Sequence, residues 1–133
     1  MTQYLLDTNH ASKAIVANSP LRQRMATTAS GLFFLCMPVI AELWFMVENS
    51  ARATDNERNL REFVSVFQVL PFDGDAAREY GRVRTELRRA GRPITQLDAQ
   101  IAAIARLTDS VVLTADQHFS FVTRLRVENW LRP

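Results

Sequence analysis

The chain has 133 residues, 47% of them hydrophobic and 23% charged, which is enough for one domain with an apolar core. The net charge is only +2, but Lys13 is the only lysine among 16 basic residues, and the planar guanidinium of the arginines suits phosphate. No apolar run approaches the ~20 residues of a membrane span, and Cys36, the only cysteine, excludes a disulfide framework. We expect one domain over residues 1–133, without a signal peptide before Asp7, in a reducing cytoplasm.

Strand-like and helix-like segments alternate along the chain. Short apolar runs predict strands over residues 4–6, 32–36, 66–70 and 110–113, with a possible fifth over 125–127. Apolar residues at helical spacing predict helices that end near residues 16, 29 and 51, one around 60–64, one across 76–87 with Gly91 as its stop, and one across 97–105. This alternation predicts a three-layer α/β/α sandwich with a mostly parallel central sheet of four to five strands.

Two aspartates directly follow predicted buried strands. Asp7 comes after the run Tyr4-Leu5-Leu6, and Asp116 follows the strand that ends at Leu113. Open α/β sheets bind ligands at the edge where their strands end, so both carboxylates are candidates for a site there. The alternative for each is a helix N-cap.

Two further acids lie near predicted helix starts. Glu42 is the only charge between residues 37 and 47, and its helical neighbours are apolar, so it needs a cation, a partner or a wet cleft. The alternative is a narrow stripe that faces solvent. Asp98 ends the segment Thr95-Gln96-Leu97-Asp98, which has the form of a capping box and is explained by that role alone.

The combination of the four acids indicates a metal site. Carboxylates held a few ångströms apart repel each other, so the pKa of at least one of them rises unless a cation neutralises them. Mg²⁺ and Mn²⁺ prefer such oxygen ligands. His10 and His118 each stand alone and are expected to be surface or packing residues. A carboxylate-bound metal beside arginines suggests phosphodiester chemistry.

The segment from residue 76 to residue 92 is rich in arginine. One interpretation is a solvated helix face on which Glu79 pairs with Arg82, and Glu86 with Arg82 or Arg89. The other is contact with an RNA backbone. The RNA-contact interpretation assigns binding to Arg82, Arg88, Arg89 and Arg92.

The sequence resembles the PIN-domain ribonucleases, and within them the VapC toxins of bacterial toxin–antitoxin pairs. The resemblance covers nearly the whole chain and rests on five segments in order, at residues 6–9 (Leu-Asp-Thr-Asn), 40–43 (Ile-Ala-Glu-Leu), 91–103, 112–116 and 125–130. It implies a PIN-like fold and Mg²⁺- or Mn²⁺-dependent endonucleolytic cleavage of RNA, often a tRNA. It also implies a small antitoxin as partner, and we expect a homodimer.

The resemblance implies roles for individual residues. The catalytic, metal-binding carboxylates would be Asp7, Glu42, Asp98 and Asp116, with Thr8, Asn9, Thr114 and His118 in support. Because some relatives have an acid at the position of His118, either this residue or Asp116 could complete the metal site.

Two alternatives to the ribonuclease stay open. One is a PIN-like RNA- or protein-binding module that has lost catalysis. The other is a magnesium-dependent phosphotransfer protein. A receiver domain needs a late lysine, whereas this chain has only Lys13, and a haloacid-dehalogenase-like phosphatase needs a second aspartate where Asn9 stands.

Overall fold

The structure, a computed structural model, describes residues 1–131 and is built around a sheet of five parallel strands. The strands follow the order β3-β2-β1-β4-β5 across the sheet. Their bounds are Thr2–Leu6 (β1), Gly31–Cys36 (β2), Gln68–Leu70 (β3), Val111–Leu113 (β4) and Val127–Glu128 (β5). The predicted three-layer α/β/α architecture is therefore confirmed.

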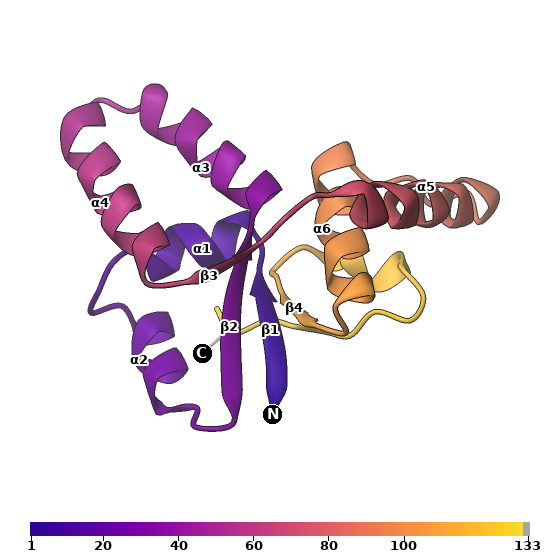
Figure 1. Ribbon diagram of the computed structural model, residues 1–133, viewed down its shortest axis with the longest axis horizontal. Helices are drawn as coiled ribbons and strands as arrows, with labels where there is room; N and C mark the ends of the chain where they lie inside the picture. Colours follow the sequence, from indigo (N-terminus) through magenta and orange to yellow (C-terminus); the bar gives the residue numbers. More distant parts are fainter. Residues whose placement is uncertain (132–133) are drawn as a thin grey trace.

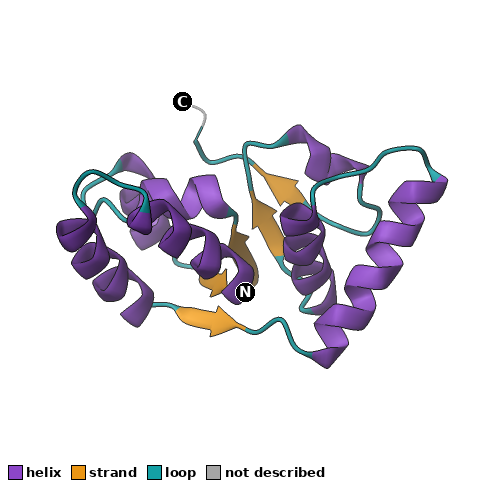
Figure 2. Cartoon of the chain, turned by 90° about the horizontal axis from the view of Figure 1, so that it is seen from above, coloured by secondary structure: helices purple, strands orange, loops and turns teal. Residues whose placement is uncertain are grey.

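Helices cover both faces of the sheet. Figure 2 shows the strands between two groups of helices, with α1 to α4 on one side and α5 and α6 on the other, as the labels of Figure 1 identify them. The chain steps from β1 to β2 to β3 in one direction and then crosses back to β4, so right-handed crossovers put the last helices on the opposite face. The bounds are Thr8–Ala14 (α1), Pro20–Thr27 (α2), Met37–Glu48 (α3), Ala53–Ser65 (α4), Gly74–Arg89 (α5), Gln96–Leu107 (α6) and Gln117–Phe121 (the 3-10 helix η1).

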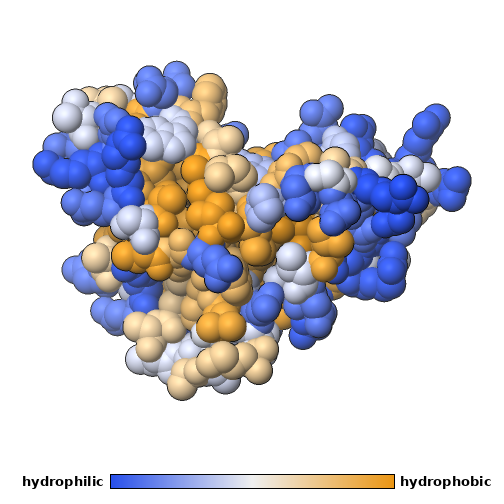
Figure 3. All heavy atoms as spheres, viewed as in Figure 1, coloured by the Kyte–Doolittle hydropathy of each residue, from blue (hydrophilic) through white to orange (hydrophobic). Residues whose placement is uncertain are grey.

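Burial on both faces explains the unalternated apolar strands. Leu5, Leu6, Val112 and Leu113 lie at the centre of the sheet and are fully buried. Figure 3 shows apolar residues gathered down the middle of one face of the molecule, between hydrophilic surfaces over α4 and α5. No helix within residues 1–131 is both long and apolar enough to cross a membrane.

The predicted bounds of the third and fifth strands are wrong. The third strand begins at Gln68 rather than residue 66, because Val66 still caps α4 and donates its N–H to the carbonyl of Phe63. The fifth strand comprises Val127 and Glu128 rather than residues 125–127, since its pairing with β4 starts only where the N–H of Val112 donates to the carbonyl of Arg126. Both are edge strands with one neighbour, so pairing rather than hydrophobicity sets their limits.

A glycine closes α5, as predicted. Gly91 has φ +67°, a conformation that favours glycine, and Arg92 donates its N–H to the carbonyl of Leu87 at 2.9 Å. Thr95 then caps α6 by accepting the N–H of Asp98 at 3.2 Å. These bonds fix the short connection between the two helices.

Candidate active site

The register of β1 and β4 places Asp7 at the carboxyl edge of the sheet. Leu6 is paired with Leu113, and the N–H of Asp7 donates to the carbonyl of Leu113 at 3.0 Å. Asp7 is almost fully buried, and its Oδ1 accepts the N–H of His10 at 2.9 Å, which caps α1. The capping interpretation is therefore confirmed. The capping bond uses Oδ1 and leaves the second carboxylate oxygen of Asp7 without a hydrogen bond to residues 1–131.

His10 connects Asp7 to the end of the described chain. The ring is completely buried, and its Nε2 accepts the N–H of Trp130 at 3.1 Å. A neutral ring that accepts at Nε2 carries its proton on Nδ1, which lies 3.3 Å from Oδ1 of Asp7 without a well-directed hydrogen bond. The sequence predicted only a surface or packing role for His10. Nothing in it signals a partner 120 positions away.

Asp116 follows β4 in a tight turn. The hydroxyl of Thr114 accepts the N–H of Asp116 at 2.9 Å, and Oδ1 of Asp116 accepts the N–H of His118 at 2.9 Å, so Asp116 also caps a helix as its alternative predicted. The ring Nδ1 of His118 lies 2.9 Å from the same oxygen. The side chain of His118 is 61% exposed against 35% for Asp116, so the imidazole lies on the solvent side of the carboxylate.

Asp98 is close enough to Asp116 and Asp7 for both acids to affect its pKa. It lies half-buried in the first turn of α6. Burial, the charge of Asp116, a hydrogen bond shared with Asp116 and the charge of Asp7 raise the pKa of Asp98 to about 6, while the hydroxyl of Thr95 opposes the rise. Within residues 1–131, no arginine or lysine contributes to this shift.

Glu42 is not among the acids that affect the pKa of Asp98. It is half-buried on the second turn of α3, after β2, and it makes no ion pair or hydrogen bond with residues 1–131. Its neighbours Phe45 and Met46 are 63% and 45% exposed, so the surroundings are less enclosed than the sequence suggested. Across residues 1–131, no three acidic, histidine or cysteine side chains converge closely enough to hold one ion in this arrangement.

The neighbouring side chains are mostly neutral. The hydroxyl of Thr8 is buried next to Asp7 with no hydrogen-bond partner in the described part of the chain, and Asn9 is exposed. Burial raises the pKa of the Cys36 thiol to about 12, so it stays protonated and is no metal ligand at neutral pH. The donors at this edge are hard oxygens, which fit Mg²⁺ or Mn²⁺.

The arginines predicted to bind RNA do not lie on one surface. Arg82 pairs with Glu79 at 3.1 Å, as the solvated-face interpretation expected. The expected partners of Glu86 are wrong, because it faces α6 and pairs with Arg106 and Arg124 instead. Arg89 shares a shallow groove with Arg78 and Arg82, Arg88 shares a cleft with Arg84, and the guanidinium of Arg92 lies 4.8 Å from the ring centre of Phe121.

Comparison with known proteins identifies the family. Residues 4–125 match the model of the PIN domain. The chain belongs to the PIN-domain family. The PIN chain is 33% identical to the "tRNA(fMet)-specific endonuclease VapC" of Shigella flexneri, over 98% of this chain and 99% of that protein. It is 30% identical to "Ribonuclease VapC2" of Haemophilus influenzae, over 98% of this chain and all of that protein.

Solved structures give the same family. A crystal structure of DNA-bound VapBC from Salmonella typhimurium superposes on 98% of this PIN chain and 99% of that chain, with a TM-score of 0.88 and 30% identity. The crystal structure of VapBC2 from Rickettsia felis, bound to a DNA fragment from its promoter, has a TM-score of 0.89 and 27% identity. The match covers 97% of this chain and 99% of that chain. Ribonucleases of this domain generally depend on a divalent metal ion.

Proposed function

We propose that the protein is an endoribonuclease that hydrolyses phosphodiester bonds in RNA, with a tRNA as the expected substrate. We further propose that it is the toxin of a toxin–antitoxin pair and is neutralised by a cognate antitoxin protein. Full-length relatives at 30–33% identity carry the names tRNA-specific endonuclease and ribonuclease, which supports the activity. The similarity to VapBC complexes supports the partner. A homodimer stays a prediction, which light scattering on the purified chain can test.

One observation carries the proposed chemistry. Burial, the charges of Asp116 and Asp7 and a hydrogen bond with Asp116 raise the pKa of Asp98 to about 6, and within residues 1–131 no arginine or lysine forms an ion pair with any of these three acids. A protein gains nothing in stability from such repulsion, so an uncompensated acidic group at a ligand-binding edge is typical of a functional site.

A divalent cation is the group that these donors fit. Asp7, Asp98 and Asp116 would hold Mg²⁺ or Mn²⁺, and Glu42 is proposed as a further ligand from α3. When bound, the ion would activate water and neutralise charge that develops on the phosphate. The oxygens of these acids suit either metal, so the choice between them is left to experiment.

The protein's own contribution is to hold the acids in place. The N–H of His10 and the edge of β4 fix Asp7, and the hydroxyl of Thr114 fixes the turn that carries Asp116. The hydroxyl of Thr8 is buried and has no hydrogen-bond partner within residues 1–131. We propose supporting roles for Thr8, Thr114 and, at the outer side of Asp116, His118.

The test is cleavage of purified tRNA by Asp7→Asn and by a matched control, Asp75→Asn. Asp75 is an exposed aspartate in the first turn of α5, and it is not among the acids that affect the pKa of Asp98. We expect wild type and Asp75→Asn to cleave with Mg²⁺ or Mn²⁺ and to stop in EDTA, and Asp7→Asn to lose cleavage while its circular dichroism spectrum stays native. Cleavage by Asp7→Asn at the wild-type rate would refute the site, and an inert wild type would favour a non-catalytic binding module.

A further inference from the structure

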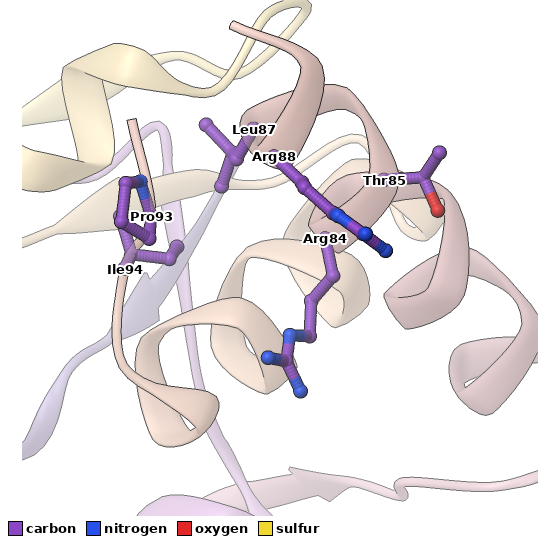
Figure 4. Close-up of a pocket in the computed structure, with 6 residues that line it drawn as sticks. All are labelled: Arg84, Thr85, Leu87, Arg88, Pro93 and Ile94. Atoms are coloured by element: carbon purple, nitrogen blue, oxygen red, sulfur yellow. The ribbon is translucent and has the colours of Figure 1, made fainter. Parts of the chain in front are cut away.

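A cleft of about 430 Å³ lies between α5 and the connection to α6. This volume is within the range of roughly 300–1,000 Å³ that is typical of ligand sites. Figure 4 shows Arg84 and Arg88 extending from consecutive turns of α5, with Pro93 and Ile94 on the opposite side. Leu87 and Thr85 complete the lining. One wall of the cleft is therefore cationic and the other is apolar.

The positive charge of the cleft is not neutralised. Within residues 1–131, neither Arg84 nor Arg88 forms an ion pair with a carboxylate. The acids of α5 that could have done so face the other way. Glu79 and Glu86 are held by Arg82, Arg106 and Arg124, and the Arg106 side chain among them is 96% buried, its exposed fraction being 4%. Two guanidinium groups are thus left for an anion from outside the chain.

Arg84 is oriented by a neutral partner. Its Nη1 donates to the hydroxyl of Tyr80 at 3.1 Å, and its guanidinium lies 5.7 Å from the centre of the same ring. Tyr80 is itself packed edge-on against Phe72 at 5.9 Å between ring centres. A tyrosine holds the arginine without cancelling its charge. Part of the side-chain entropy that binding would cost is therefore already lost in the free protein.

The cleft adjoins the acidic group through α6. Ile94 precedes Thr95, the residue that caps α6 by binding the N–H of Asp98. Four peptide links separate Ile94 from Asp98, so their Cα atoms are at most about 15 Å apart. A single short chain can therefore reach both places. Its anions must recur at short intervals, because residues four apart on a helix are roughly 5–6 Å apart at Cβ.

We infer that the Arg84–Arg88 cleft binds the RNA backbone a few nucleotides from the bond that is cut. Arginine forks donate two parallel hydrogen bonds to a phosphate, and the apolar wall of Pro93 and Ile94 suits the face of a base or sugar. The spacing of the two arginines suits adjacent phosphates of a stretched single strand. This inference rests on the proposed ribonuclease function, whose substrate it places on one particular face of α5.

The experiment measures RNA binding without cleavage. A fluorescein-labelled single-stranded RNA is titrated with protein in EDTA at several salt concentrations, and fluorescence anisotropy gives the association constant. The variants are Arg84→Gln, Arg88→Gln and the double substitution. Arg78→Gln is the control, since it removes one exposed charge from the same helix outside the cleft. Each lost phosphate contact should reduce the slope of log K against log salt by about 0.7 for a single strand.

We expect a slope lower by about 0.7 in each single variant and by about 1.4 in the double variant, with Arg78→Gln like wild type. If the slope changed equally in Arg78→Gln and in the single cleft variants, the loss of net charge would explain the effect and the inference would be overturned. Wild-type protein that does not bind RNA would overturn it as well. An oligo-glutamate peptide serves as a second probe. If the substitutions weaken binding of this peptide but leave RNA binding unchanged, the cleft is a site for an acidic protein segment and the inference is overturned. Cleavage of tRNA by wild type is scored separately, so failure of the ribonuclease proposal and failure of the cleft are told apart.

Discussion

Neutralising Asp98 should stabilise the metal-free protein at neutral pH. Asp98→Asn removes the charge that burial, Asp116 and Asp7 all oppose, and the new amide can donate to Asp116. The sequence suggested that the change would also lose a cap. In the structure the cap is the hydroxyl of Thr95 bound to the main-chain N–H of residue 98, so the substitution keeps it.

The size of the effect follows from the pKa of Asp98. The pKa rises from 3.8 in the unfolded chain to about 6 in the folded protein. At about 1.4 kcal/mol per pKa unit this corresponds to roughly 3 kcal/mol, and solvent near the half-buried group reduces it to about 1–3 kcal/mol. At about pH 3, well below the unfolded-state pKa of 3.8, the carboxyl is protonated in both states and costs nothing. The penalty begins as pH rises through 3.8, grows up to about pH 6 and is nearly complete at pH 7.

Thermal unfolding in EDTA from pH 3 to pH 7.5, followed by circular dichroism, measures this difference. Wild type and Asp98→Asn should melt together near pH 3 and diverge above it, by roughly 3–5 °C per kcal/mol for a chain of this size. Asp75→Asn should stay with wild type. Mg²⁺ at a hundredfold excess over its Kd should then stabilise wild type by about 2.7 kcal/mol, and Asp98→Asn by less. Equal melting temperatures at pH 7 without metal would refute the reasoning.

Three further outcomes are expected. Asp116→Asn should weaken both the Mg²⁺-dependent rise in melting temperature and the cleavage of RNA, while His118→Ala leaves both nearly unchanged. If His118→Ala instead lost cleavage only with Mn²⁺, His118 rather than Asp116 would be the metal ligand. The Cys36 thiol should not react with a chromogenic disulfide reagent at pH 8 until the protein unfolds. Rapid release of the coloured product by the native protein would contradict the burial of the thiol. Arg106→Met leaves the buried carboxylate of Glu79 with only the exposed Arg82 as a partner and should cost up to about 3–5 kcal/mol in urea unfolding, with part recovered by adding Glu79→Gln.

The sequence by itself determined the order and type of the elements. Short apolar runs without alternation are typical of strands buried on both faces. Helical segments between such strands indicate crossovers, so the local pattern predicts a parallel sheet covered by helices. The same pattern placed Asp7 and Asp116 beyond strand ends. It also marked Thr95 and Asp98 as a helix start, because capping depends on neighbours three residues apart.

Tertiary structure alone decided which of these residues meet. Asp7 and Asp116 lie close because β4 is inserted beside β1, an order that depends on the crossover after β3 and not on any short segment. The link from His10 to Trp130 and the reversal of Glu86 toward Arg106 join residues far apart in sequence. Helical spacing divides the arginines of α5 among different faces, but only the packing of α5 on α6 determines which face keeps its charge. The reason is that α6 supplies Arg106, which pairs with Glu79 and Glu86, two of the three acids of α5.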